Sequence, residues 1–238
     1  MNRASKHSIC LIIMALITII WGLAVQAQTQ LNAPVEQGVS PTPGAEVEKQ
    51  FHKARENFLK KDYQNAAAEI RQAAAFLKKE AEQTTGEGKQ ALIASVQELD
   101  QLADRERKGA VNSAQELEHA FARANHALAK YYQGKASESW ARRAVSEAGR
   151  DLGVAAVHLE EALGWADYQW EAENRETINA AKDIGKKMQQ GVGWVDTEVR
   201  KGIEAMGKEI DEAGQKMGFL KLFQSPSISV SEKTGGGC

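Results

Sequence analysis

The feature that most constrains the fold is a long stretch without proline. Residues 45 to 225 contain none, while three prolines precede the stretch and Pro226 follows it. Proline breaks helix interiors because it lacks a backbone donor, and this stretch is instead rich in Ala, Glu, Lys, Gln and Leu, which favour helices. We therefore predict an all-α protein, with an antiparallel helical bundle at residues 47–172 followed by one long amphipathic helix at residues 173–218.

The first 27 residues have the pattern of an export signal. Arg3 and Lys6 supply positive charge, residues 9–25 are uncharged and mainly apolar, and Val25 and Ala27 place small residues at a cleavage site. We predict cleavage after Ala27 and a periplasmic or secreted protein. The alternative is an uncleaved membrane anchor, because the apolar stretch has the minimum length that spans a bilayer.

The sequence predicts that both flanks of the helical region are unstructured. The charge balance separately bears on which partners can be expected. Prolines and glycines in residues 28–46 predict a disordered tether, and residues 219–238 predict a flexible tail. Removal of the signal leaves Cys238 as the only cysteine, so no internal disulfide can form. The formal net charge of −2 gives no reason to expect nucleic acid or an anionic membrane as a partner.

The bundle opens with a helical hairpin, which we expect at residues 47–59 and 63–81. Asp62 and Tyr63, followed by Ala66, Ile70 and Ala73, resemble the second helix of a tetratricopeptide-type hairpin. The similarity covers about 30 residues and does not recur at the repeat period, which argues against a repeat array. An exported, alanine-rich helical chain with such a hairpin also resembles the YfdX family of bacterial periplasmic proteins, which implies a helical protein of that compartment.

Three further helices are predicted in the bundle. The third helix runs to about residue 108, and Ser113 with Glu116 forms a capping box that begins the fourth. Gly134 is expected to end the fourth helix, and Ser137 to cap the fifth.

The final predicted helix carries a regular apolar ridge. Its members follow steps of 4, 4 and 3 residues, repeated, and this period of eleven residues in three turns keeps them on one helix face. The ridge consists of Ile184, Met188, Val192, Val195, Val199, Ile203, Met206 and Ile210. Glycines such as Gly185, Gly191, Gly202 and Gly207 flank it, and they either allow another helix to approach closely or are merely tolerated.

The ridge leads to our first functional hypothesis, because it must be covered by the bundle, by a second copy or by lipid. Its polar face has no basic excess, which disfavours membrane contact. We therefore expect a protein partner or self-association through the C-terminal helix, in a non-enzymatic protein with an envelope-stress or protective role. The alternative is a binding module for an apolar small molecule or lipid, held in a pocket of Tyr131, Trp140, Trp165 and Trp170.

No catalytic, cofactor or metal site is predicted. Glu116 and His119 form a single Glu-x-x-His, whereas a di-iron bundle needs that motif twice. We interpret His52, His119, His126 and His158 as locally hydrogen-bonded side chains.

Overall fold

The computed structural model describes residues 44–84, 86–167 and 172–218. These residues contain helices and turns but no strand, so the all-α prediction is confirmed. The helices are α2 (Ala45–Leu59), α3 (Tyr63–Glu82), α4 (Gly86–Arg107), α5 (Ala114–Ala141), α6 (Val145–Trp165), α7 (Ala172–Gln190) and α8 (Asp196–Lys216). The predicted export signal, the tail and nearly all of the tether lie outside the described residues.

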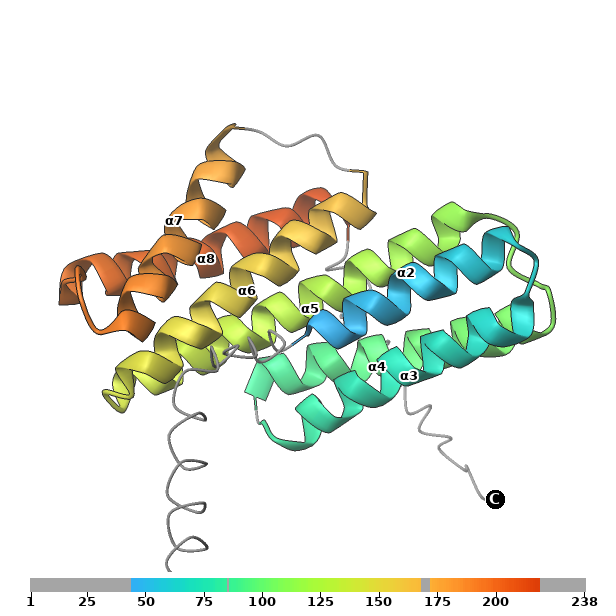
Figure 1. The fold of residues 1–238 in the computed structure, drawn as a ribbon, viewed down its shortest axis with the longest axis horizontal. Helices are drawn as coiled ribbons and strands as arrows, with labels where there is room; N and C mark the ends of the chain where they lie inside the picture. Colours follow the sequence, from blue (N-terminus) through green and yellow to red (C-terminus); the bar gives the residue numbers. More distant parts are fainter. Residues whose placement is uncertain (1–43, 85, 168–171, 219–238) are drawn as a thin grey trace, which may run out of the picture. The chain divides into compact units, whose positions relative to one another are not determined.

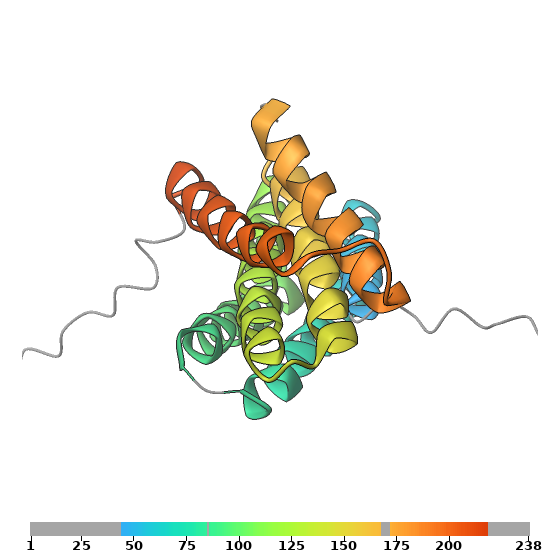
Figure 2. The ribbon, with the colours of Figure 1, turned by 90° about the vertical axis from the view of Figure 1, so that its left-hand side faces the viewer.

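Helices α5 and α6 form the centre of this unit. Figure 1 shows α2, α3 and α4 on one side of them and α7 and α8 on the other, and Figure 2 shows the same arrangement along the helix axes. One apolar cluster joins α2, α3 and α4 to α5 and α6, and a second joins α7 and α8 to the same two helices. Within the described residues, no helix combines the length and apolarity needed to cross a bilayer.

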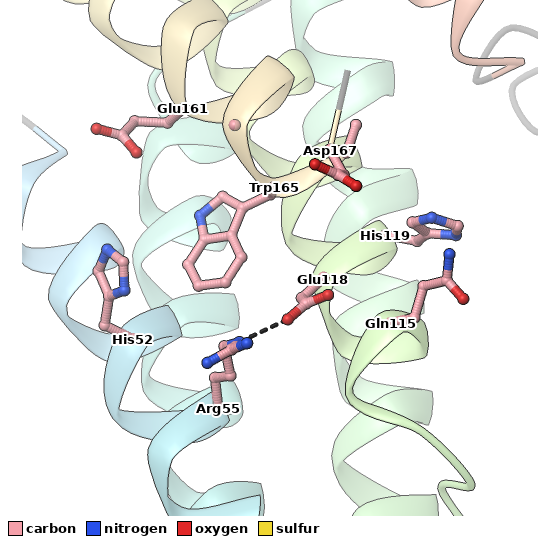
Figure 3. Close-up of a pocket in the computed structure, with 10 residues that line it drawn as sticks. His52, Arg55, Gln115, Glu118, His119, Glu161, Trp165 and Asp167 are labelled. Carbon is pink, nitrogen blue, oxygen red and sulfur yellow. Dashed lines mark hydrogen bonds and ion pairs between the residues drawn. The ribbon is translucent and has the colours of Figure 1, made fainter. Parts of the chain in front are cut away.

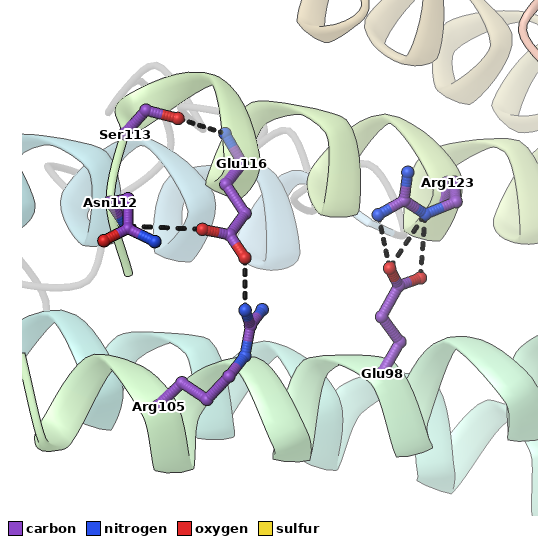
Figure 4. A network of polar contacts seen from close by, with 6 residues as sticks. All are labelled: Glu98, Arg105, Asn112, Ser113, Glu116 and Arg123. Carbon is purple, nitrogen blue, oxygen red and sulfur yellow. Dashed lines mark hydrogen bonds and ion pairs between the residues drawn. The ribbon is translucent and has the colours of Figure 1, made fainter. Parts of the chain in front are cut away.

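The start of α5 is fixed by the predicted capping box. The hydroxyl of Ser113 accepts a hydrogen bond from the backbone N–H of Glu116 at 3.3 Å. The Glu116 carboxylate accepts from the backbone N–H of Asn112, also at 3.3 Å, and pairs with Arg105 of α4 (Figure 4). The same side chain therefore satisfies an orphan donor and joins two helices.

The predicted break at Gly134 and Ser137 is wrong. Helix α5 continues through both residues to Ala141, and the chain reverses only at Arg143, which has a φ of +62°. Ala136 between the two is completely buried, so packing against the rest of the core outweighs the local preference for a helix end.

The prediction of one continuous helix over residues 173–218 is also wrong. The helix ends at Gln190, and α8 begins at Asp196 after a turn in which Gly191 and Gly193 have φ angles of +72° and +74°. Glycine adopts these left-handed angles without steric cost, and a glycine just after the last helical residue is the usual helix stop. The turn folds α8 back so that it contacts α7, α6 and α5.

Candidate functional site

The structure places the predicted apolar ridge inside the protein. Six of its eight members are buried in the cluster formed with α5 and α6: Ile184, Met188, Val199, Ile203, Met206 and Ile210. Val192 and Val195 lie in the turn between α7 and α8 and are 64% and 60% exposed. The chain's own central helices therefore cover most of the surface on which association was expected.

Three of the four flanking glycines named above make close contacts within the chain, and the fourth, Gly191, lies in the turn after α7. A Cβ on Gly185 of α7 would lie 2.5 Å from the backbone oxygen of Gly149 on α6. A Cβ on Gly202 would lie 2.6 Å from the side chain of Ile184, and one on Gly207 would lie 2.9 Å from Gln133. Of the two explanations for these glycines, close helix approach fits, and the approach is intramolecular.

The aromatic residues predicted to form one pocket have separate surroundings. Tyr131 is buried against Tyr132, with ring centroids 4.8 Å apart. Trp140 packs edge-on against Trp194, with ring centroids 5.8 Å apart, beside the apolar cluster that contains α7 and α8. Trp165 instead packs against the cluster that contains α2, α3 and α4. Trp170 lies outside the described residues. The predicted pocket is thus not formed by Tyr131, Trp140 and Trp165, because α5 carries the first two to different parts of the core.

A cleft of about 600 Å³ does form at one end of the bundle, where α2, the start of α5 and the end of α6 meet (Figure 3). We call it the Trp165 cleft, because the half-buried indole lies at its centre. Its volume falls in the usual range for small-molecule sites. The lining residues are His52, Arg55, Gln115, Glu118, His119, Glu161, Gly164, Trp165, Ala166 and Asp167.

A chain of polar contacts behind the cleft holds Trp165 in place. The indole N–H donates to the Glu48 carboxylate at 2.5 Å, and the Asn125 amide donates to the other oxygen of Glu48 at 2.9 Å. The amide oxygen of Asn125 lies 2.8 Å from Nδ1 of His158. The contacts tie α2, α5 and α6 together, so the position of the indole depends on all three helices.

Burial determines the charge states of the ionisable groups in this series of polar contacts. Burial raises the pKa of Glu48, although the hydrogen bonds from Asn125 and Trp165 oppose the shift. Complete burial lowers the pKa of His158 to about 3, so its ring is neutral at ordinary pH. Because the carbonyl oxygen of Asn125 can only accept, the proton of the neutral ring is on Nδ1.

The histidines do not assemble a metal centre in the described part of the chain. His52 and His119 line the Trp165 cleft, while Nε2 of His126 lies 2.8 Å from the backbone oxygen of Ile210 in the core. No group of three or more His, Cys, Asp or Glu side chains among residues 44–84, 86–167 and 172–218 is close enough to hold an ion.

Sequence reasoning identified Trp165 but missed Glu48 and Asn125, which position it. The sequence offers one signal for Asn125, because it is a polar residue between Ala124 and His126 in a helix rich in alanine. The partners of such a residue are far away in sequence, so their identity requires the fold. No family model, curated protein or solved structure matches this chain.

Proposed function

We propose that this protein is a non-enzymatic binding module for a small molecule with an apolar part, and that the Trp165 cleft is its site. The observation that supports this proposal is the half-buried indole in a cleft of about 600 Å³ with polar groups around it. Binding sites commonly combine one apolar or aromatic wall with a few placed polar groups. An indole ring offers a large contact area to an apolar ligand.

Association through the C-terminal ridge is less well supported than ligand binding. Its expected contact surface is mostly covered by α5 and α6, and the exposed remainder is the pair Val192 and Val195. Two valines expose far less apolar area than a stable protein interface buries.

The lining of the cleft disfavours covalent catalysis by a hydroxyl or thiol. Among the described residues, it includes no Ser, Thr, Tyr or Cys that could act as a nucleophile beside His52 or His119. A hydroxyl or thiol nucleophile must lie within hydrogen-bonding reach of a base that activates it.

Export is part of the proposal. It is supported by Arg3, Lys6 and the uncharged stretch at residues 9–25, a pattern typical of a secretory signal. A binding module in the periplasm or outside the cell would meet small molecules taken from the surroundings.

The proposal is tested by titrating the purified protein with small aromatic compounds, including 2-phenylethanol and 2-phenylethylamine, in a calorimeter. We expect saturable binding by at least one compound. Trp165→Leu should weaken it about tenfold or more, because the ligand loses the aromatic wall.

Trp140→Leu is the matched control, since Trp140 lies in a different cavity and a different apolar cluster. It loses a tryptophan of similar burial but should leave the affinity unchanged. Circular dichroism checks that both variants stay helical. Equal weakening by the two variants, or no binding by the unaltered protein, would count against the Trp165 cleft as the site.

A further inference from the structure

The Trp165 cleft has an excess of negative charge. Arg55 is the only lysine or arginine among the described residues that line it, and the Glu118 carboxylate pairs with it at 2.5 Å. Glu161 and Asp167 also line the cleft, and neither carboxylate has a hydrogen bond or an ion pair with another described residue. Figure 3 shows Glu161 on the His52 side of the indole.

Among the carboxylates of the cleft, Glu161 is the one whose ionised form a bound cation would stabilise most. Its side chain is half-buried, and burial, followed by the negative charge of Glu48, raises its pKa. Neither His52 nor Lys182 approaches the Glu161 carboxylate to ion-pair distance, and Lys182 pairs with Glu160 instead. A bound cation would offset both the burial and the repulsion.

A second cavity of about 380 Å³ shares His52 and Glu161 with the cleft and is also lined by Glu48 and His158. His158 is only 2% exposed, and its Nε2 has no hydrogen-bond partner among the described residues. With the proton on Nδ1, this nitrogen presents a lone pair and therefore acts only as an acceptor.

Gly44 and Lys49 also line this second cavity, and neither supplies a partner for its acceptors. Gly44 packs against the His158 ring, where a Cβ would lie 2.1 Å from Nε2, so only glycine fits. Lys49 is exposed at the edge of the cavity and forms no ion pair with Glu48 or Glu161 in the described structure. Nε2 of His158 and the Glu161 carboxylate are therefore acceptors without a partner in the described structure, and they suit a ligand that donates hydrogen bonds and carries positive charge.

The indole of Trp165 fits the same ligand. Its N–H is already used by Glu48, so the ring offers a ligand its face or edge and no donor. The face of an indole attracts cations through its quadrupole, and it also packs against apolar groups.

We propose that the ligand of the Trp165 cleft is a primary organic ammonium attached to an apolar group, with the ammonium at Glu161 and the apolar group against Trp165. This inference rests on the proposed binding function and assigns the chemical class of its ligand. The ammonium supplies a positively charged partner for the Glu161 carboxylate and N–H donors for the acceptors that lie near it.

The test compares ligands of one shape and different charge: 2-phenylethylamine, 2-phenylethanol and 3-phenylpropionate. Calorimetry on the purified protein should give an affinity for the amine at least about tenfold higher than for the alcohol, and the weakest binding for the carboxylate. Glu161→Gln should reduce the amine-to-alcohol ratio to about one to two. Glu204→Gln, at an exposed position on α8, is the matched control and should leave the ratio unchanged.

A fourth compound, N,N,N-trimethyl-2-phenylethylammonium, separates hydrogen bonding from charge alone, because it cannot donate. It should bind more weakly than the primary amine. Tighter binding of the trimethyl compound would overturn the assignment of a primary ammonium. Equal affinities for amine, alcohol and carboxylate would overturn the cation preference but leave the binding function standing, whereas no binding by any compound would overturn both.

Discussion

Glu48, which is partly buried, and Glu106, which is fully buried, are two carboxylates with opposite surroundings. Glu48 accepts hydrogen bonds from Asn125 and Trp165, which compensate for part of its burial. Glu106 at the end of α4 is completely buried, and neither of its oxygens has a hydrogen-bond partner among the described residues. An ionised carboxylate without partners is destabilising in the core, so Glu106 favours its protonated form.

The first prediction is that Glu106→Gln stabilises the protein at pH 8 but not at pH 5. Burial, followed by the charge of Glu116, raises the pKa of Glu106 to about 7 from 4.5. The folded state therefore binds more protons than the unfolded state between these values, and the free energy of unfolding falls as pH rises from about 4.5 to 7. Glutamine removes this loss, which we expect to be about 2 kcal/mol at pH 8.

Urea denaturation of both proteins at pH 5 and pH 8 measures the difference. Glu204→Gln changes an exposed glutamate to the same residue and should show no pH-dependent gain. A constant difference between Glu106→Gln and the unaltered protein at the two pH values would contradict the raised pKa.

Helices could be predicted from the sequence wherever local signals and packing agree. The predicted hairpin at 47–59 and 63–81 differs from α2 and α3 by only one or two residues at the ends, and the Ser113 cap is confirmed. The errors involve glycine, whose effect depends on context: Gly134 stays helical because the buried Ala136 follows it, whereas Gly191 ends α7. The cleft could not be predicted, because Glu48, Asn125 and Trp165 meet only through tertiary packing.

The crossing of α6 and α7 gives the second prediction, which concerns Gly185. Gly185→Ala should destabilise the protein by about 1–3 kcal/mol, because the new Cβ would overlap backbone atoms that cannot rotate away. It would lie 2.5 Å from the oxygen of Gly149 and 3.2 Å from the nitrogen of Gly153, so the two helices would have to separate.

Gly153→Ala on the facing helix is the matched control. A Cβ there would meet nothing within 4 Å, so the substitution should be neutral or stabilise the helix by up to about 1 kcal/mol. The midpoints of urea denaturation compare the two variants. If Gly185→Ala were as stable as Gly153→Ala, the close approach of α6 and α7 would be refuted.

The two apolar clusters of the described unit are joined by α5 and α6. Helix α5 contributes Leu128 to the cluster with α2, α3 and α4, and the adjacent Ala129 to the cluster with α7 and α8. Helix α6 does the same with Ala155 and Ala156. Neither cluster can lose its packing without exposing a face of the two central helices, so we expect both to unfold together.

The third prediction follows from this shared core. Leu77→Ala on α3 and Met206→Ala on α8 remove completely buried side chains from different clusters, and each should cost about 2–5 kcal/mol. Scanning calorimetry should show one transition for both variants, shifted to lower temperature, while Leu59→Ala at a site 56% exposed should shift it little. Two resolved transitions, of which Met206→Ala moved only one, would mean that α7 and α8 form an independent unit. A single transition would mean that the Trp165 cleft, built on α2, α5 and α6, depends for its shape on the helices that cover the opposite side of the central pair.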